Sequence, residues 1–251
     1  MDKLHLSDHI SRQFNEDLEE IRTRVLTMGG LVEHQFADAV RALLEGDGEL
    51  GKEVVRGDHR VNGMEVAIDE EATRIIARRQ PAASDLRLII SIIKTITDLE
   101  RIGDEVEKVA RLAAFLGESG KLTHGHAEIE SQAATVRQML HGALDAFARL
   151  DAEAALAVAR MDDRVDQAYE SIMRQSITFM VEDSRTIRRA LDTLWCARAL
   201  ERIGDHAGNI CEHVIFLVGG KDVRHTTIEQ MAEALAGGGG EEPGGEGEGP
   251  D

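Results

Sequence analysis

The stretch LERIGDEVEKV at residues 99–109 recurs in altered form as LERIGDHAGNI at residues 200–210. A second pair of similar strings precedes them, DHRVN at 58–62 and DDRVD at 162–166. The members of the two pairs lie 101 and 104 residues apart, so both the order and the spacing of the strings are repeated. Self-similarity at a nearly fixed separation is the signature of an internal duplication, and we expect two copies of one structural unit.

Composition indicates that this unit is helical. Aromatic residues make up 3% of the chain, and two of the three prolines fall in the final stretch GGGGEEPGGEGEGPD, which leaves Pro81 as the one proline of the body. The β-branched and aromatic side chains that favour strands are not clustered anywhere. Apolar residues recur instead at steps of three and four, as at Phe14, Leu18, Ile21 and Val25. This period is typical of helices, and the expected fold class is all-α.

We expect three helices in each copy. The periodicity places them at about 11–44, 52–79, 84–117, 127–150, 151–181 and 183–218, with Ser84, Asp151 and either Asp183 or Ser184 as N-caps. The glycine-rich segment GESGKLTHGHAE separates the copies. The expected architecture is two tandem three-helix bundles of a spectrin-like kind, at 1–118 and 119–220. Residues 221–251 form an extension with a short helix and a disordered Gly/Glu-rich tail.

Charge and cysteine content restrict the environment and the partners. The formal net charge of −18 repels phosphate backbones and anionic lipid headgroups, so direct binding to nucleic acid or to a membrane is not expected. Cys196 and Cys211 stand fifteen positions apart in one expected helix. That is about 22 Å, too far for a disulfide. The N-terminal sequence lacks a signal-peptide pattern and no run approaches eighteen apolar residues, which predicts a cytoplasmic protein.

The repeated motif places two carboxylates on one helix face. Glu100 and Asp104, like Glu201 and Asp205, are four residues apart and therefore neighbours one turn apart. The apolar stripe that follows the first motif lies well over 100° away around the helix, so the carboxylates are expected on the outer face. The preceding strings add oxygen-bearing side chains at the same spacing, namely Asp58, Asn62, Asp162 and Asp166.

These carboxylates have two interpretations. A charged row on a helix is usually just solvated, and the Ile-Gly pairs at 102–103 and 203–204 can instead be explained by close helix packing. Like charges four apart nevertheless destabilise a helix by a few tenths of a kcal/mol, so their presence in both copies suggests a bound cation. Oxygen ligands without thiolates indicate Mg²⁺, Mn²⁺ or iron rather than structural zinc.

Signatures of common enzymes are missing from the sequence. There is no phosphate-binding loop, no H-E-x-x-H, no C-x-x-C and no G-x-S-x-G, and the Glu-x-x-His pairs of di-iron bundles do not occur. His206 is expected to be an exposed side chain, and Trp195 is expected to pack between helices.

Two tandem three-helix bundles with twin LERIGD strings, each preceded by D-x-R-V-[ND], resemble the PhoU family of bacterial phosphate-transport accessory proteins over about residues 10–218. The resemblance implies a cytoplasmic, non-enzymatic regulator of phosphate uptake and phosphate homeostasis. Such a protein works beside a phosphate ABC transporter and a sensor histidine kinase and damps the phosphate-starvation response. It implies a homodimer, and contact with the membrane only through these partners.

The resemblance also implies surface metal clusters. Carried over by position, the ligands are Glu100, Asp104, Glu201 and Asp205, with Asp58, Asn62, Asp162 and Asp166 as contributors. The first copy departs from the family pattern where Glu105, Glu107 and Lys108 follow the motif, so the second copy is expected to be the better site. The alternatives are a metal-binding or metal-storage protein that uses the surface carboxylates, and a helical scaffold without a ligand.

Overall fold

The structure is a computed structural model that describes residues 3–81, 83–119, 125–224 and 226–237. The helices are α1 (Lys3–Glu45), α2 (Gly48–Gly57), α3 (His59–Arg79), α4 (Ala83–Ser119), α5 (His126–Arg149), α6 (Ala152–Ala159), α7 (Asp162–Glu182), η1 (Ser184–Thr186), α8 (Ile187–Gly219) and α9 (Ile228–Gly237). Strands are absent from these ranges. The all-α prediction is therefore confirmed, and α5–α8 repeat the plan of α1–α4.

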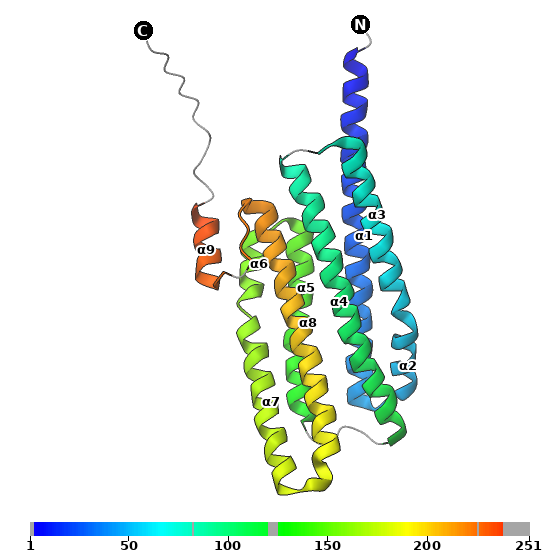
Figure 1. The fold of residues 1–251 in the computed structure, drawn as a ribbon, viewed down its shortest axis with the longest axis vertical. Helices are drawn as coiled ribbons and strands as arrows, with labels where there is room; N and C mark the ends of the chain where they lie inside the picture. Colours follow the sequence, from blue (N-terminus) through cyan, green and yellow to red (C-terminus); the bar gives the residue numbers. More distant parts are fainter. Residues whose placement is uncertain (1–2, 82, 120–124, 225, 238–251) are drawn as a thin grey trace.

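The two halves lie side by side along their long helices. Figure 1 shows α4 and α8 next to each other in the middle, with α1 and α3 on one side, α6 and α7 on the other, and α5 beside α8. The most extensive packing in the molecule is between α4 and α8, and α1 also contacts α5. Among the described residues, no helix combines the length and the apolar character needed to cross a bilayer.

The second helix of each half, expected to be continuous, is broken. In the first half α2 ends at Gly57, and Val61 N donates to Asp58 O at 2.8 Å; in the second, Met161 N donates to Val158 O at 2.9 Å. Such i to i−3 bonds tighten the chain and let the two pieces take different directions. Both breaks occur at or just before the D-x-R-V-[ND] strings, so these strings begin a new helix.

Other helix ends differ from expectation by smaller amounts. α1 begins eight residues before Ser11, and Ser84 lies inside α4 rather than capping it. Asp151 caps α6 by accepting from Ala154 N at 2.9 Å, as expected, whereas Asp183 caps the short η1 that precedes α8. The expected short helix in the C-terminal extension is α9, and the tail beyond residue 237 is outside the described residues.

The buried apolar side chains of both halves form one connected core. The stripe predicted after the first motif, Ile102, Val106, Val109 and Ala113, is fully buried. The glycines of the two motifs let the neighbouring helix approach: a Cβ on Gly103 would lie 3.3 Å from Val61 Cγ1, and one on Gly204 would lie 3.4 Å from Val165 Cγ1. The close packing that the Ile-Gly pairs suggest is therefore present, and it brings the start of α3 onto α4 and the start of α7 onto α8.

Candidate functional site

Four carboxylates come together where α7 begins against the middle of α8. Asp162 and Asp166 lie in the first turns of α7, and Glu201 and Asp205 lie on α8. One oxygen from each of Asp166, Glu201 and Asp205 lies within 4.8 Å of the other two. Since cation–carboxylate bonds are about 2.0–2.6 Å long, one ion can contact all three oxygens. We call these four residues the second carboxylate cluster.

Two oxygens of this cluster are buried without a hydrogen bond. Among the described residues, Asp162 Oδ1 and Glu201 Oε2 have no partner, although Glu201 Oε1 accepts from Arg198 Nη1. A Cβ on Gly204 would lie 3.8 Å from Asp162 Oδ1, an ordinary van der Waals separation, so this carboxylate lies directly against α8. An unsatisfied buried oxygen costs about 1–3 kcal/mol, and more when it is charged. A cation would therefore stabilise these two atoms most.

Crowding raises the proton affinity of the second carboxylate cluster. Burial, then the charge of Asp205, raises the pKa of Glu201 to about 7 against the opposing effect of Arg198. Burial, then the charge of Asp166, raises the pKa of Asp162 to about 6, and the same two causes raise the pKa of Asp205. In the absence of a cation, part of the cluster therefore holds protons close to neutral pH.

The first half has a related arrangement at the start of α3, the first carboxylate cluster of Asp58, Asn62, Glu100 and Asp104. Asn62 Nδ2 donates to Asp58 Oδ2 at 3.2 Å. Asp58 Oδ1 and Asn62 Oδ1 are buried and have no hydrogen-bond partner within the described ranges. An amide thus takes the place that a carboxylate has in the second half.

Neighbouring acids extend the first carboxylate cluster along α3 and α4. Burial, then the charge of Glu107, raises the pKa of Asp58, and burial, then Asp104, raises the pKa of Glu100. Burial and Asp69 also raise the pKa of Glu65. The eight residues predicted from the sequence thus lie in two groups of four, and cation binding by these groups stays a prediction.

Three expectations about side-chain exposure are wrong. Glu201, expected on the outer face, has an exposed fraction of 8%, because α7 packs over it and Arg198 pairs with it. His206 is buried rather than exposed, since it faces α4. Trp195, expected between helices, is 61% exposed. Each error concerns α8, whose surroundings are set by helices distant in the sequence.

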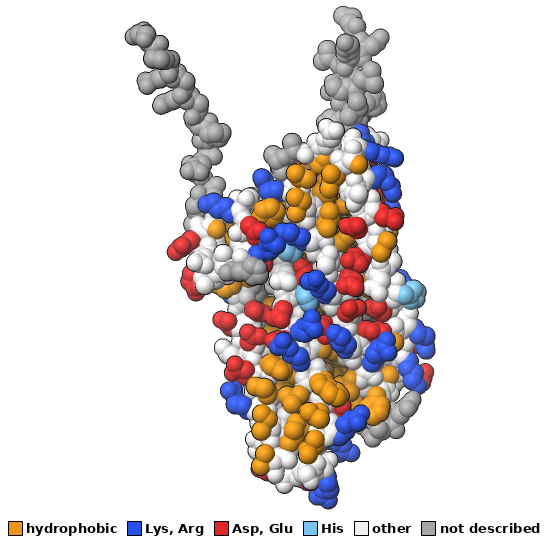
Figure 2. Space-filling view, in the orientation of Figure 1, with side chains coloured by type: hydrophobic (Ala, Val, Ile, Leu, Met, Phe, Trp, Pro, Cys, Tyr) orange, Lys and Arg blue, Asp and Glu red, His pale blue; other side chains and the backbone are white. Residues whose placement is uncertain are grey.

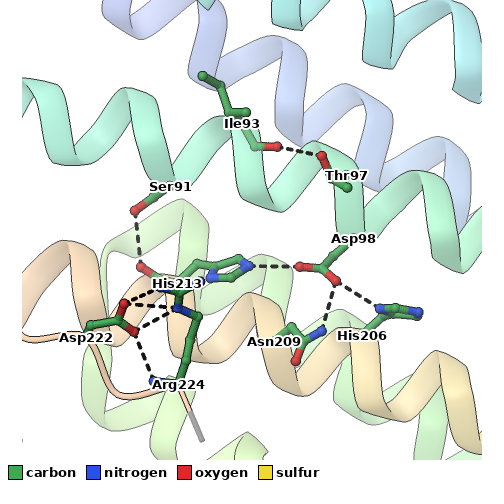
Figure 3. A network of polar contacts seen from close by, with 9 residues as sticks. All are labelled: Ser91, Ile93, Thr97, Asp98, His206, Asn209, His213, Asp222 and Arg224. Atoms are coloured by element: carbon green, nitrogen blue, oxygen red, sulfur yellow. Dashed lines mark hydrogen bonds and ion pairs between the residues drawn. The ribbon is translucent and has the colours of Figure 1, made fainter.

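A buried polar network that sequence reasoning missed joins the two halves (Figure 3). Asp98 on α4 accepts from His206 Nδ1 at 2.9 Å, from Asn209 Nδ2 at 3.0 Å and from His213 Nε2 at 2.8 Å, all on α8. Despite burial, the hydrogen bonds from the two imidazoles and the amide hold the pKa of Asp98 well below its usual range. The network therefore fixes α8 against α4 between the two carboxylate clusters.

The two clusters lie on either side of the face formed by α4 and α8. Figure 2 shows acidic side chains on both flanks of this face, with Lys and Arg between them and an apolar patch below. Some of the cations belong to local ion pairs: buried Glu105 contacts Lys108 Nζ at 2.8 Å and Arg202 Nη1 at 2.9 Å. Charge on this face is therefore segregated rather than mixed.

Known proteins resemble both halves of the chain. A family model described as the PhoU domain matches residues 25–113 and again 129–214. The chain is 53% identical, over 94% of its length and 93% of the relative's, to the phosphate-specific transport system accessory protein PhoU homolog of Pseudomonas putida. The crystal structure of PhoU from Pseudomonas aeruginosa covers 83% of this chain and 100% of its own, with a TM-score of 0.81 and 54% identity.

A more distant solved structure has the same fold. The crystal structure of the phosphate transport system regulatory protein PhoU from Streptococcus pneumoniae is 30% identical, with a TM-score of 0.78 over 84% of this chain and 99% of its own. The similarity in fold therefore extends over both halves of the chain.

Proposed function

The chain belongs to the PhoU family, and from this premise we propose that it is a cytoplasmic regulator of phosphate uptake that acts without catalysing a reaction. It would work with a phosphate ABC transporter and a sensor histidine kinase, and it would repress the phosphate-starvation response when phosphate is plentiful. The observation that carries the proposal is the PhoU-domain match in both halves, together with a relative of 53% identity that is named a transport accessory protein.

Complementation tests this role. In a Pseudomonas putida strain that lacks its own PhoU homolog, we expect a phosphate-starvation reporter to be active in phosphate-rich medium. Expression of this chain should restore repression, and the variant Glu201→Ala, Asp205→Ala should restore less of it. A reporter that stays active with the folded wild-type chain present at native levels would contradict the proposal.

We propose further that the carboxylate clusters bind Mg²⁺, Mn²⁺ or iron. Support comes from the three oxygens within 4.8 Å and from the buried oxygens of Asp162 and Glu201 that have no partner among the described residues. An all-oxygen donor set suits hard or borderline cations. The ion would neutralise the repulsion between α7 and α8 and tie the start of one helix to the middle of the other.

Metal content tests the second proposal directly. After treatment with chelator, Mg²⁺, Mn²⁺ and Fe³⁺ are added separately and the metal per chain is measured after desalting. We expect bound metal in the wild type and a loss in Glu201→Ala, Asp205→Ala. A matched control is Glu16→Ala, Glu20→Ala, which removes two exposed carboxylates at the same spacing from α1. Equal loss in both variants would show that binding is a non-specific effect of charge.

Self-association is the remaining part of the proposal. The family resemblance implies a homodimer, which light scattering would report as twice the chain mass of 27.5 kDa. A single mass of 27.5 kDa across the accessible concentration range would contradict it.

A further inference from the structure

A groove between the end of α4 and the beginning of α8 has a chemistry that neither carboxylate cluster uses. Its volume is about 600 Å³. Its lining includes the cations Lys108, Arg111, Arg188, Arg198 and Arg202, the aromatic side chains of Phe115 and Trp195, and the carboxylates of Glu105 and Asp192. We call this the basic aromatic groove. It lies in the lower part of the face in Figure 2, where apolar side chains gather below Lys and Arg.

The groove exposes two large aromatic side chains beside its cations. Trp195 is 61% exposed and Phe115 is 48% exposed, and the buried side chains of Val109, Cys196 and Ala199 also line the groove. The Arg188 guanidinium lies 5.3 Å from the centre of the Phe115 ring. Tryptophan and arginine are the residues most enriched at the energetic centres of protein interfaces. Exposed aromatic side chains of this kind indicate a surface that another molecule covers.

The charge of the groove opposes that of the rest of the protein. Five cations and two carboxylates line it, and Arg111 and Arg198 also contact Glu107 and Glu201 outside the lining, which leaves an excess of one positive charge on a chain of net charge −18. Glu105 contacts both Lys108 and Arg202, and Asp192 contacts Arg188 at 3.6 Å, so the lining's two acids are already paired. Because cations still outnumber carboxylates here, an occupant that carries negative charge is complementary to the groove.

The length of the groove selects the kind of occupant. Glu105 to Phe115 spans about 15 Å of α4, and Arg188 to Arg202 spans about 21 Å of α8, at 1.5 Å per residue. That is three to four helical turns. A long apolar floor with cations along its rims fits a helix that has apolar residues on one face and Asp or Glu beside them. A second copy that presented the same groove across a twofold axis would place cations against cations.

We propose that the basic aromatic groove binds an acidic amphipathic helix of another protein. The apolar face of that helix would cover Phe115 and Trp195, and its carboxylates would meet Arg188 and Arg111. The inference goes beyond the proposed regulatory role and does not depend on cation binding by the carboxylate clusters.

Trp195 supplies the measurement, because it is the only tryptophan of the chain. The probe is a synthetic 16-residue peptide of Leu, Ala and Glu, with Leu recurring every three or four positions, titrated into the full chain at 0.15 M salt. We expect a saturable blue shift of Trp195 emission. A peptide of the same composition with the leucines scrambled should cause no shift.

Two pairs of variants locate the binding. Arg188→Glu should weaken peptide binding by about tenfold or more, since it replaces an attraction with a repulsion at the edge of the groove. Its matched control is Arg174→Glu on α7. Arg188 forms an i,i+4 ion pair at 3.6 Å and its side chain is 68% exposed; Arg174 forms one at 3.5 Å and its side chain is 69% exposed. Phe115→Ala should weaken peptide binding, whereas Val66→Ala on the exposed side of α3 should leave it unchanged.

Three results would overturn the proposal. Equal weakening by Arg188→Glu and Arg174→Glu would mean that only the overall charge matters. Equal binding of the scrambled peptide would show that binding does not need an apolar helix face. Trp195 emission that depends on protein concentration without peptide, and loses this dependence in Phe115→Ala, would assign the groove to contact between copies of this chain.

Discussion

The second carboxylate cluster has four carboxylates, whereas the first has three carboxylates and an amide. Asp166 contributes an oxygen to a group within 4.8 Å, while Asn62, at the equivalent position, uses its Nδ2 to donate to Asp58 at 3.2 Å. The first half thus satisfies one of its carboxylate oxygens with its own amide, whereas in the second half Arg198 pairs with one oxygen of Glu201, and Asp162 Oδ1 and Glu201 Oε2 are left without a partner among the described residues. The packing around Gly103 and Gly204 is therefore similar in the two halves, whereas the side chains of the two carboxylate clusters differ.

The halves differ most in what they contribute to their shared interface. Asp98 comes from the first half, and its equivalent in the second is Ala199. We expect Asp98→Asn to lower the free energy of unfolding, measured with urea, by about 3 kcal/mol, because breaking a buried charge network leaves its partners unsatisfied. The control Asp145→Asn, in a half-exposed pair with Arg149, should cost less than about 1 kcal/mol.

The same variant has a testable dependence on pH. The hydrogen bonds from His206, His213 and Asn209 outweigh burial and hold the pKa of Asp98 below its unfolded value. That unfolded value is about 3.9, so the contribution of Asp98 is present above this pH and is lost as the pH falls through the folded pKa. The destabilisation by Asp98→Asn should therefore shrink below about pH 4. An unchanged difference at pH 3 would argue against an ionised Asp98.

The next largest expected change in stability concerns the packing of α2 in the first half and of α6 in the second. Gly51 on α2 is so close to α4 that a Cβ would lie 2.7 Å from Ala110 O, whereas the equivalent residue on α6 is Ala155. Gly51→Ala should destabilise the protein by about 1–3 kcal/mol through overpacking. The reciprocal change Ala155→Gly should cost about 1 kcal/mol through helix propensity. A neutral Gly51→Ala would show that α2 can move away from α4 freely.

The sequence was sufficient for the repeated fold and for the grouping of the eight cluster residues, while their role as metal ligands stays a prediction. Periodicity identifies Ile102, Val106, Val109 and Ala113 as buried because that pattern is local to one helix. The break before Asp162 is not visible, since neither Arg160 nor Met161 interrupts a helical pattern. Both α6 and α7 pack against α8, and such tertiary packing is not encoded in local propensity.

The polar network around Asp98 could be predicted only with knowledge of which helices are in contact. His206, Asn209 and His213 stand at i, i+3 and i+7, which places them on one face, and Asp98 lies four residues before buried Ile102. These spacings are a usable signal for polar residues on a buried face. Their pairing depends on α4 meeting α8, over a hundred residues away, and that contact is tertiary.

A reciprocal exchange tests whether one residue explains the difference between the clusters. Asn62→Asp should strengthen Mn²⁺ binding at the first cluster, and Asp166→Asn should weaken it at the second, each by about tenfold, since one ionised ligand is gained or lost. Calorimetric titration on chelator-treated protein gives both affinities. The nearby exchange Asp163→Asn is the control, as Asp163 is exposed. Equal effects of Asp163→Asn and Asp166→Asn would attribute the difference to general charge.

The last expected effect is a change in the pH dependence of stability without metal. The folded pKa values of Glu201 and Asp162, about 7 and about 6, lie above their unfolded values. Those are about 4.3 and 3.9, so the folded state binds more protons in this window and its stability falls as pH rises from 5 to 7.5. Glu201→Gln should flatten this slope more than Glu100→Gln. Added Mn²⁺ should reverse the slope, because metal binding requires deprotonated carboxylates. If stability without metal instead rises with pH over this range, the second cluster is solvated. The two clusters would then not differ in proton affinity.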